Sequence, residues 1–279
     1  MYGSWCLSCF FLIDCPYLGG TIGITGEMIG YEMIILGIGI GLFSLTTFSS
    51  VSQFIIMGNM IGIIALLSSR DWLIAIPAWE ILNLSLYLLA GVRGLQYFLM
   101  SALSTTLFIG GVAILYAFWG ATTTNFEIDN NIGILLIMIA LIFKLGAAPF
   151  HSWAPDLYSR ISFSYTSFFA LLPKLTILGF LLLLQYFSPM VAILSLVIGA
   201  IGISGQWLIG RFVAYSSMVH LGYFFLATSS LTSFLFYALA YGTISLFDSS
   251  HPKIGTLFSH SHSFGHIYHL GQSIKLAIA

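Results

Sequence analysis

Three ionisable side chains lie inside long apolar stretches of the sequence, where they are placed for proton chemistry. Each lies in a different predicted membrane span: Glu80 in residues 72–92, Lys144 in 132–153 and Lys174 in 164–187. At about 1.5 Å per helical residue, Lys144 lies about 18 Å beyond Ile132 and Lys174 about 21 Å beyond Arg160. A charge at such a depth in a bilayer is costly and usually marks an ion or proton pathway.

A buried glutamate and lysine that approach and separate can move a proton. The pKa of a buried lysine responds strongly to its surroundings, and a neighbouring carboxylate stabilises the ammonium form. The alternative is a static buried ion pair that only fixes the register of the helices. Three such residues on three spans favour proton or ion transport.

Helix-breaking residues accompany both lysines. Gly146 and Pro149 follow Lys144 and predict a broken helix at mid-membrane depth, a feature that recurs at ion sites in transporters. Pro173 directly precedes Lys174, and its missing N–H would free a carbonyl one turn back as an oxygen partner for the ammonium. The alternative for Pro173 is a simple kink for packing.

Two histidines are further candidates. His220 lies among the polar residues Ser216, Ser217 and Tyr223, which favours a proton relay over a hydrogen bond that only joins two helices. His151 lies at the inner end of its span, as a residue of a channel mouth or as an interfacial anchor.

The composition is that of an integral membrane protein. Of 279 residues, 59% are hydrophobic and 6% are charged, whereas soluble domains have about 25% charged residues. The formal net charge of -1 argues against a nucleic-acid partner. The sequence shows no Arg-rich presequence, so we expect insertion where the chain is made, in a bacterium or an organelle.

The apolar segments predict an all-α membrane protein, a polytopic bundle of about nine transmembrane helices. The predicted spans are residues 33–49, 52–69, 72–92, 96–119, 132–153, 164–187, 190–209, 212–228 and 231–247. Glu32 and Arg70 flank the first two spans. We divide the chain into an irregular N-terminal segment (1–30), a transmembrane antiporter-like domain (31–248) and a His-rich polar tail (249–279). The positive charges of the loops place the C-terminus on the cytoplasmic or matrix side.

Two other clusters are less specific. Cys6 and Cys9 form a C-x-x-C pair, either a redox or metal pair or small apolar residues, and no second pair completes a zinc site. The His-rich tail is either a metal site or a polar surface segment, and the lack of accompanying carboxylate or cysteine ligands favours the surface segment. No nucleotide-binding motif occurs, so we expect no cofactor and no metal in this chain.

Four motifs occur in the order of one known family. FKLGAAPFHSWAPDLY around Lys144 resembles the broken-helix motif of the antiporter-like subunits of respiratory complex I, and its DLY ending resembles subunit 2 (bacterial subunit N). Three more segments are similar to that subunit: AWEILNLSLYLLAG around Glu80, LQYFLMSALSTTLFIGGVAILYAFWG after it, and GRFVAYSSMVHLGYFFLA around His220. The resemblance covers roughly residues 51–248.

The resemblance implies a proton-translocating membrane-arm subunit of NADH:ubiquinone reductase, built as an inverted repeat of five-helix units. It implies Glu80 and Lys144 as a coupled pair. It also implies Lys174 as the central relay and His220 as a connector. NADH, flavin, iron–sulfur clusters and ubiquinone would belong to other subunits, and the partners would be other membrane-arm subunits and lipids. The implied location is the mitochondrial inner membrane or, alternatively, the bacterial plasma membrane.

The chain departs from the family pattern. SRISFSYTS replaces an Ala-Pro-rich turn, and Pro173 is unusual before the relay lysine. A second broken helix is missing after the last predicted span, so we expect either a separate chain that supplies it or a subunit that has lost its second half-channel. The alternative functions are a cation/proton antiporter subunit and a structural membrane-arm spacer that no longer pumps.

Overall fold

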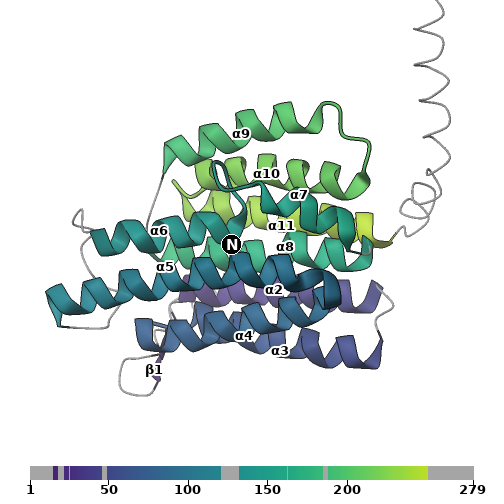
Figure 1. Cartoon of the computed structure of the whole chain (residues 1–279). Coiled ribbons are helices and arrows are strands. Elements are labelled where there is room, and N and C mark those ends of the chain that lie inside the picture. Colours follow the sequence, from purple (N-terminus) through teal and green to yellow (C-terminus); the bar gives the residue numbers. More distant parts are fainter. Residues whose placement is uncertain are drawn as a thin grey trace, which may run out of the picture.

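The fold is a bundle of roughly parallel helices (Figure 1). The computed structural model describes residues 15–17, 22–24, 26–45, 49–120, 132–161, 163–184 and 188–250. The long helices are α2 (Gly26–Leu45), α3 (Ser50–Leu67), α4 (Trp72–Ala90), α5 (Leu95–Trp119), α6 (Ile132–Leu145), α8 (Phe163–Leu183), α9 (Pro189–Ile203), α10 (Ile209–Ala227) and α11 (Leu231–Ser250). The short elements are the antiparallel pair β1 (Cys15–Tyr17) and β2 (Ile22–Ile24), the 3-10 turn η1 (Gly91–Gly94) and the helix α7 (Trp153–Arg160).

The predicted nine-helix membrane bundle is confirmed within the described residues. Four segments are long and apolar enough to cross a bilayer by length and composition: α3, α4, α5 and residues 165–182 of α8. Shorter apolar helices lie within α2, α6, α9 and α11. Large apolar side chains such as Phe54, Phe118 and Phe236 cover the outside, which suits a surface that faces lipid. The C-x-x-C pair at Cys6 and Cys9 and the histidines from His251 onward lie outside the described residues.

The first long helix begins earlier than the sequence predicts. α2 starts at Gly26, so Glu32 lies inside the helix and is only 8% exposed. A charged residue is a poor marker of a span boundary when the helix can bury it against neighbours.

The predicted helix break after Lys144 is also confirmed. α6 ends at Leu145, Gly146 adopts a φ of 66°, and α7 begins at Trp153. In Figure 1, α7 lies farther along the bundle than α6. The 14 residues of α6 span only about 21 Å, which is less than a bilayer core of about 30 Å. The break therefore leaves Lys144 inside the bundle.

Side chains satisfy the backbone at this break. The indole Nε1 of Trp153 donates to the carbonyl of Phe143 at 3.1 Å, and the hydroxyl of Ser195 accepts from the N–H of Ala148 at 3.2 Å. Irregular backbone at membrane depth requires such partners, because lipid offers none.

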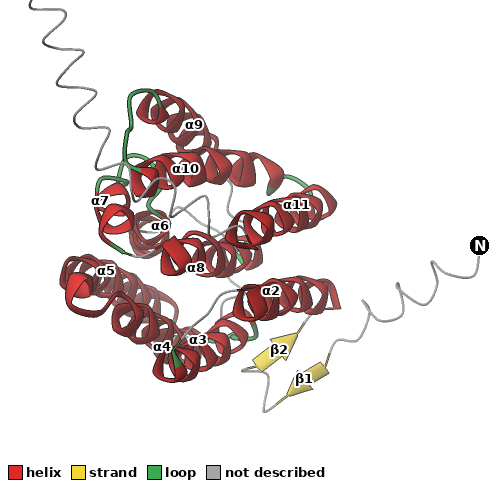
Figure 2. Ribbon diagram, turned by 90° about the vertical axis from the view of Figure 1, so that its right-hand side faces the viewer, coloured by secondary structure: helices red, strands yellow, loops and turns green. Residues whose placement is uncertain are grey.

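Helix α8 is the centre of the bundle. Viewed nearly end on, it lies between a group made of α2, α3, α4 and α5 and a group made of α6, α7, α9, α10 and α11 (Figure 2). Every residue from Phe168 to Leu181 is buried. Lys174, near the middle of this helix, is therefore enclosed on all sides.

Pro173 frees a carbonyl as the sequence predicts, but the predicted partner is wrong. A proline at 173 cannot donate to the carbonyl of Phe169, one turn back. The hydroxyl of Tyr158 on α7 donates to this carbonyl instead, at 3.1 Å. The ammonium of Lys174 therefore has a different oxygen partner from the carbonyl of Phe169.

A close contact joins α2 to α8. The hydroxyl of Tyr31 donates to the carbonyl of Leu175 at 2.6 Å. A methyl group added at Gly179 would overlap the ring of Tyr31 and would come within 3.0 Å of Leu67. The missing side chain of Gly179 is what allows Tyr31 to reach α8.

We predict that Gly179→Ala destabilises the bundle by about 1–3 kcal/mol, as overpacking of a well-packed core does. The measurement is the amount of this chain that stays soluble when detergent-solubilised native membranes are heated. Gly58→Ala is the matched control, because a methyl group there meets no atom within 4 Å. Equal melting of the two variants would contradict the proposed packing role.

We also predict that Tyr158→Phe lowers stability by about 1–3 kcal/mol, because it strands a buried carbonyl. In a Pro173→Ala background the new N–H can bond to Phe169, so the same change should cost less. The same heating assay is applied to the unaltered chain, to each single variant and to the double variant, and it measures the cost of Tyr158→Phe in both backgrounds. An equal cost in both backgrounds would disprove the link between Tyr158 and Pro173.

Candidate functional site

The ammonium of Lys144 is bound by a neutral hydroxyl and an aromatic face. Its Nζ donates to the Oγ of Ser101 at 2.6 Å and lies 4.4 Å from the centroid of the Tyr97 ring. Both partners come from α5, and Lys144 is 7% exposed. Among the described residues, no carboxylate forms an ion pair with it. A hydroxyl and a π face thus supply the polar contacts that a buried cation requires.

Glu80 reaches the same cluster through side chains of α4 and α5. The Nδ2 of Asn83 lies 3.4 Å from the Oε1 of Glu80 and donates to the Oγ1 of Thr105 at 3.1 Å. Thr105 in turn donates to the carbonyl of Ser101 at 3.1 Å. Ser101 is the residue that binds Lys144, so the expected Glu80–Lys144 pair is bridged in this structure rather than in direct contact.

A pocket of about 260 Å³ lies between α4 and α5 at this cluster. Its lining includes Glu80, Asn83, Ser101 and Thr105. The Oδ1 of Asn83 is buried and has no protein hydrogen-bond partner. The polar groups in its lining give water in a pocket of this size a place to bond to such an atom, which would connect Glu80 to the hydroxyl beside Lys144.

Lys174 is bound in the same manner as Lys144. Its Nζ donates to the Oγ of Ser217 at 2.6 Å and lies 5.6 Å from the centroid of the Tyr158 ring. The hydroxyl of Ser217 donates a hydrogen bond to the carbonyl of Ala214 at 2.7 Å, which leaves its oxygen free to accept from the ammonium. Each buried lysine thus has one serine and one tyrosine.

The two lysine sites meet at Phe169 of α8. Its ring packs edge-on against Tyr97, with centroids 5.6 Å apart, and its carbonyl accepts from Tyr158. The tyrosine beside Lys144 and the tyrosine beside Lys174 therefore contact one residue. Phe169 therefore links the two lysine sites through the aromatic partner of each ammonium group.

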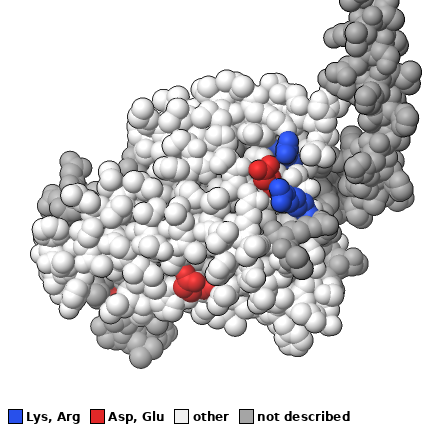
Figure 3. Space-filling model, viewed as in Figure 1, with Lys and Arg blue, Asp and Glu red and all other residues white. Residues whose placement is uncertain are grey.

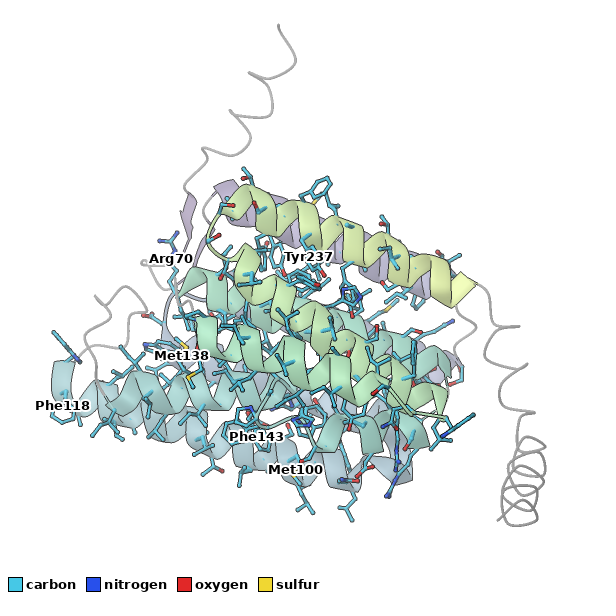
Figure 4. The ribbon with its side chains drawn as sticks, turned by 90° about the horizontal axis from the view of Figure 1, so that it is seen from above. Arg70, Met100, Phe118, Met138, Phe143 and Tyr237 are labelled. Atoms are coloured by element: carbon cyan, nitrogen blue, oxygen red, sulfur yellow. The ribbon has the colours of Figure 1, made fainter. Side chains whose placement is uncertain are left out.

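His220 lies one helical turn beyond Ser217 on α10 and points to α11. Its Nδ1 is 2.7 Å from the hydroxyl of Tyr237, and its ring centroid is 4.8 Å from that of Tyr241. Figure 4 shows Tyr237 between α10 and α11. The polar neighbours that the sequence suggested, Ser216 and Tyr223 among them, are not its hydrogen-bond partner.

His151 lies in the broken segment between α6 and α7. Its Nδ1 is buried without a hydrogen-bond partner, and its ring centroid is 6.3 Å from that of Tyr215. An ion pair between Asp156 and Arg211, 3.3 Å apart and partly exposed, joins α7 to α10. Figure 3 shows acidic and basic atoms side by side at one place, and a separate acidic patch elsewhere on the same, mostly uncharged face.

Sequence reasoning found the ionisable residues and missed their neutral partners. Tyr97, Ser101 and Thr105 recur every four residues on α5, a spacing that places them on one helix face. This polar stripe in an otherwise apolar span is the sequence feature that could have revealed the neutral partners. Within the described residues, no group of three His, Cys, Asp or Glu side chains could hold a metal ion.

The chain matches a family model described as NADH:quinone oxidoreductase/Mrp antiporter, transmembrane, over residues 69–248. It is 34% identical to NADH-ubiquinone oxidoreductase chain 2 of Rhizopus oryzae over 219 residues, which cover 66% of this chain and 42% of the relative. It is 36% identical to NADH-quinone oxidoreductase subunit N 1 of Acidiphilium cryptum over 196 residues, which cover 58% of this chain and 41% of the relative. The chain thus spans about two fifths of the length of these relatives.

Solved structures give the same relationship. A chain of respiratory complex I from Thermus thermophilus superposes with a TM-score of 0.77 and 26% identity over 88% of this chain and 61% of that chain. A chain of the Mrp complex from Dietzia sp. shares the fold, with a TM-score of 0.65 and 17% identity over 81% of this chain and 50% of that chain. The predicted resemblance is confirmed: this chain belongs to the NADH:quinone oxidoreductase/Mrp antiporter transmembrane family.

Proposed function

We propose that this chain is a proton-translocating membrane-arm subunit of respiratory complex I. The observation that carries the proposal is the pair of matched lysine sites, in which each buried ammonium binds a neutral serine and a tyrosine ring. A lysine held by neutral groups can lose its proton without leaving a buried anion unpaired. The family includes both kinds of subunit, and the names of the relatives support this function over that of a cation/proton antiporter subunit.

The first step concerns Glu80 and Lys144. In the arrangement described above, Asn83 holds Glu80 while Ser101 holds Lys144. Movement of the carboxylate toward the ammonium would stabilise the charged lysine, and its withdrawal would favour release of the proton. The pocket beside Glu80 provides room for this movement or for bridging water.

The later steps use Lys174 and His220. Tyr97, Phe169 and Tyr158 link the two lysine sites, so a proton leaving Lys144 needs a transient path past these rings. From Lys174 the bonded Ser217 leads one turn along α10 to His220 and then to Tyr237. Imidazole and hydroxyl groups both donate and accept protons, which suits them to a relay.

The energy for pumping would come from other subunits. We infer that NADH oxidation, flavin, iron–sulfur clusters and ubiquinone reduction belong to partner chains, because the described residues of this chain are apolar helices around a line of ionisable groups. The corresponding location is the mitochondrial inner membrane or a bacterial plasma membrane.

We predict that Lys144→Met lowers the number of protons pumped per electron in vesicles that oxidise NADH. Lys144→Arg should also lower the number of protons pumped per electron, because arginine keeps the positive charge but does not release its proton. A static structural cation, in contrast, would be replaced by arginine. An unchanged proton-to-electron ratio in Lys144→Met would remove this residue from the pumping path.

We predict that Asn83→Leu slows proton-coupled turnover about tenfold or more, because a hydrogen bond to a charged group contributes about 1.5–3 kcal/mol. Asn59→Leu is the matched control. Asn59 is also a buried asparagine with an unpaired Oδ1, but it donates to Ser85 at 2.7 Å and not to Glu80. Equal effects of the two changes would show that Asn83 acts only through stability.

A further inference from the structure

The hydroxyl of Tyr158 is a buried acid–base group to which the proposed pathway assigns no step. Tyr158 belongs to the short helix α7 and is 3% exposed. The centroid of its ring lies 5.6 Å from the Nζ of Lys174, and its hydroxyl donates to the carbonyl of Phe169 at 3.1 Å. A phenol hydroxyl can both donate and accept a proton. Tyr158 therefore places such a group next to the second lysine.

Pro173 determines where this hydroxyl is held. In a regular helix the N–H of residue 173 would donate to the carbonyl of Phe169, but a proline has no N–H. The carbonyl accepts from Tyr158 instead, five residues before Lys174 on the same helix. Because Pro173 is a departure from the family pattern, this way of holding the tyrosine is a feature of this chain.

Tyr158 is also coupled to the first lysine site. Its hydroxyl interacts electrostatically with that of Tyr97, whose ring centroid lies 4.4 Å from the Nζ of Lys144. Phe169 contacts both tyrosines, since its ring packs edge-on against Tyr97 while its carbonyl binds Tyr158. Electrostatic interactions between buried groups are weakly screened. The hydroxyl of Tyr158 thus responds to the first site and adjoins the second.

A second tyrosine hydroxyl continues from Tyr158 toward His220. Tyr241 on α11 donates to the carbonyl of Ala170 at 3.4 Å, which is the next carbonyl of α8 after that of Phe169. Its hydroxyl interacts electrostatically with that of Tyr158, and its ring centroid lies 4.8 Å from that of His220. Tyr158 is therefore coupled both to the tyrosine of the first lysine site and to the tyrosine beside the histidine.

We propose that the hydroxyl of Tyr158 carries protons from the Lys144 site to Lys174. A proton released at the first site binds the oxygen of Tyr158, and the proton that this oxygen held turns from the carbonyl of Phe169 to the neutral amine of Lys174. Tyr158 is left unchanged, the first site has lost one proton, and Lys174 has become an ammonium. The carbonyl of Phe169 holds the hydroxyl proton between transfers. This inference rests on the proposed function, because it requires protons to move between the two lysines.

The first test compares Tyr158→Phe with Tyr31→Phe in the assembled complex, in vesicles that oxidise NADH. Tyr31 is the matched control, because it is also a buried tyrosine that donates to a carbonyl of α8, that of Leu175 at 2.6 Å. We expect Tyr158→Phe to slow proton-coupled turnover about tenfold or more relative to Tyr31→Phe, since a positioned proton-transfer group contributes about 10²–10⁴-fold. Equal turnover of the two variants would overturn the proposal.

The second test separates proton transfer from stability. In the double variant Tyr158→Phe with Pro173→Ala, the new N–H at position 173 can bond to the carbonyl of Phe169, so heat stability returns while the hydroxyl stays absent. We expect this variant to pump fewer protons per electron than Pro173→Ala alone, whereas equal pumping would show that Tyr158 acts only on stability and would overturn the proposal. A loss in Lys144→Met without a loss in the double variant leaves the proposed function intact and rejects Tyr158 alone. Full pumping by Lys144→Met contradicts the proposed function itself.

Discussion

The constraint on which the structure depends is the cost of a positive charge inside an apolar bundle. Lys144 and Lys174 are each less than a tenth exposed, and lipid cannot solvate them. Both lysines are stabilised in the same way: each ammonium binds a serine oxygen at 2.6 Å and lies over the face of a tyrosine ring.

The irregular backbone follows from the same need. The break between α6 and α7 places Lys144 inside the bundle, and Pro173 disturbs α8 next to Lys174. In each place a side chain forms a hydrogen bond with the freed backbone group. Trp153 and Ser195 do so at the break, and Tyr158 does so at the proline. These bonds let the chain bend at membrane depth without unfolding, and they position Tyr158 under the second lysine.

Helix α8 connects the parts of the site. It carries Lys174, it meets Tyr97 and Tyr158 through Phe169, and it meets α2 through Tyr31. A shift of this helix would alter both lysine sites and the surroundings of Glu32 together. Such a rigid element with several dependent contacts is the kind of structure through which distant sites are coupled.

The sequence by itself determined the membrane fold, the nine long helices of the described residues, the break after Lys144 and the placement of Glu80, Lys144 and Lys174 inside spans. These depend on local composition and on single residues such as Pro149, which act within a few positions of themselves. Only the tertiary structure decided the partners: Ser101 and Ser217 for the lysines, Asn83 between Glu80 and the first site, Tyr237 for His220, and Tyr158 for the carbonyl that Pro173 frees. It also placed Glu32 inside the bundle rather than at its edge. The physical reason is that these helices are apolar on nearly every side, so their sequence does not tell which face meets which neighbour until the whole bundle has packed.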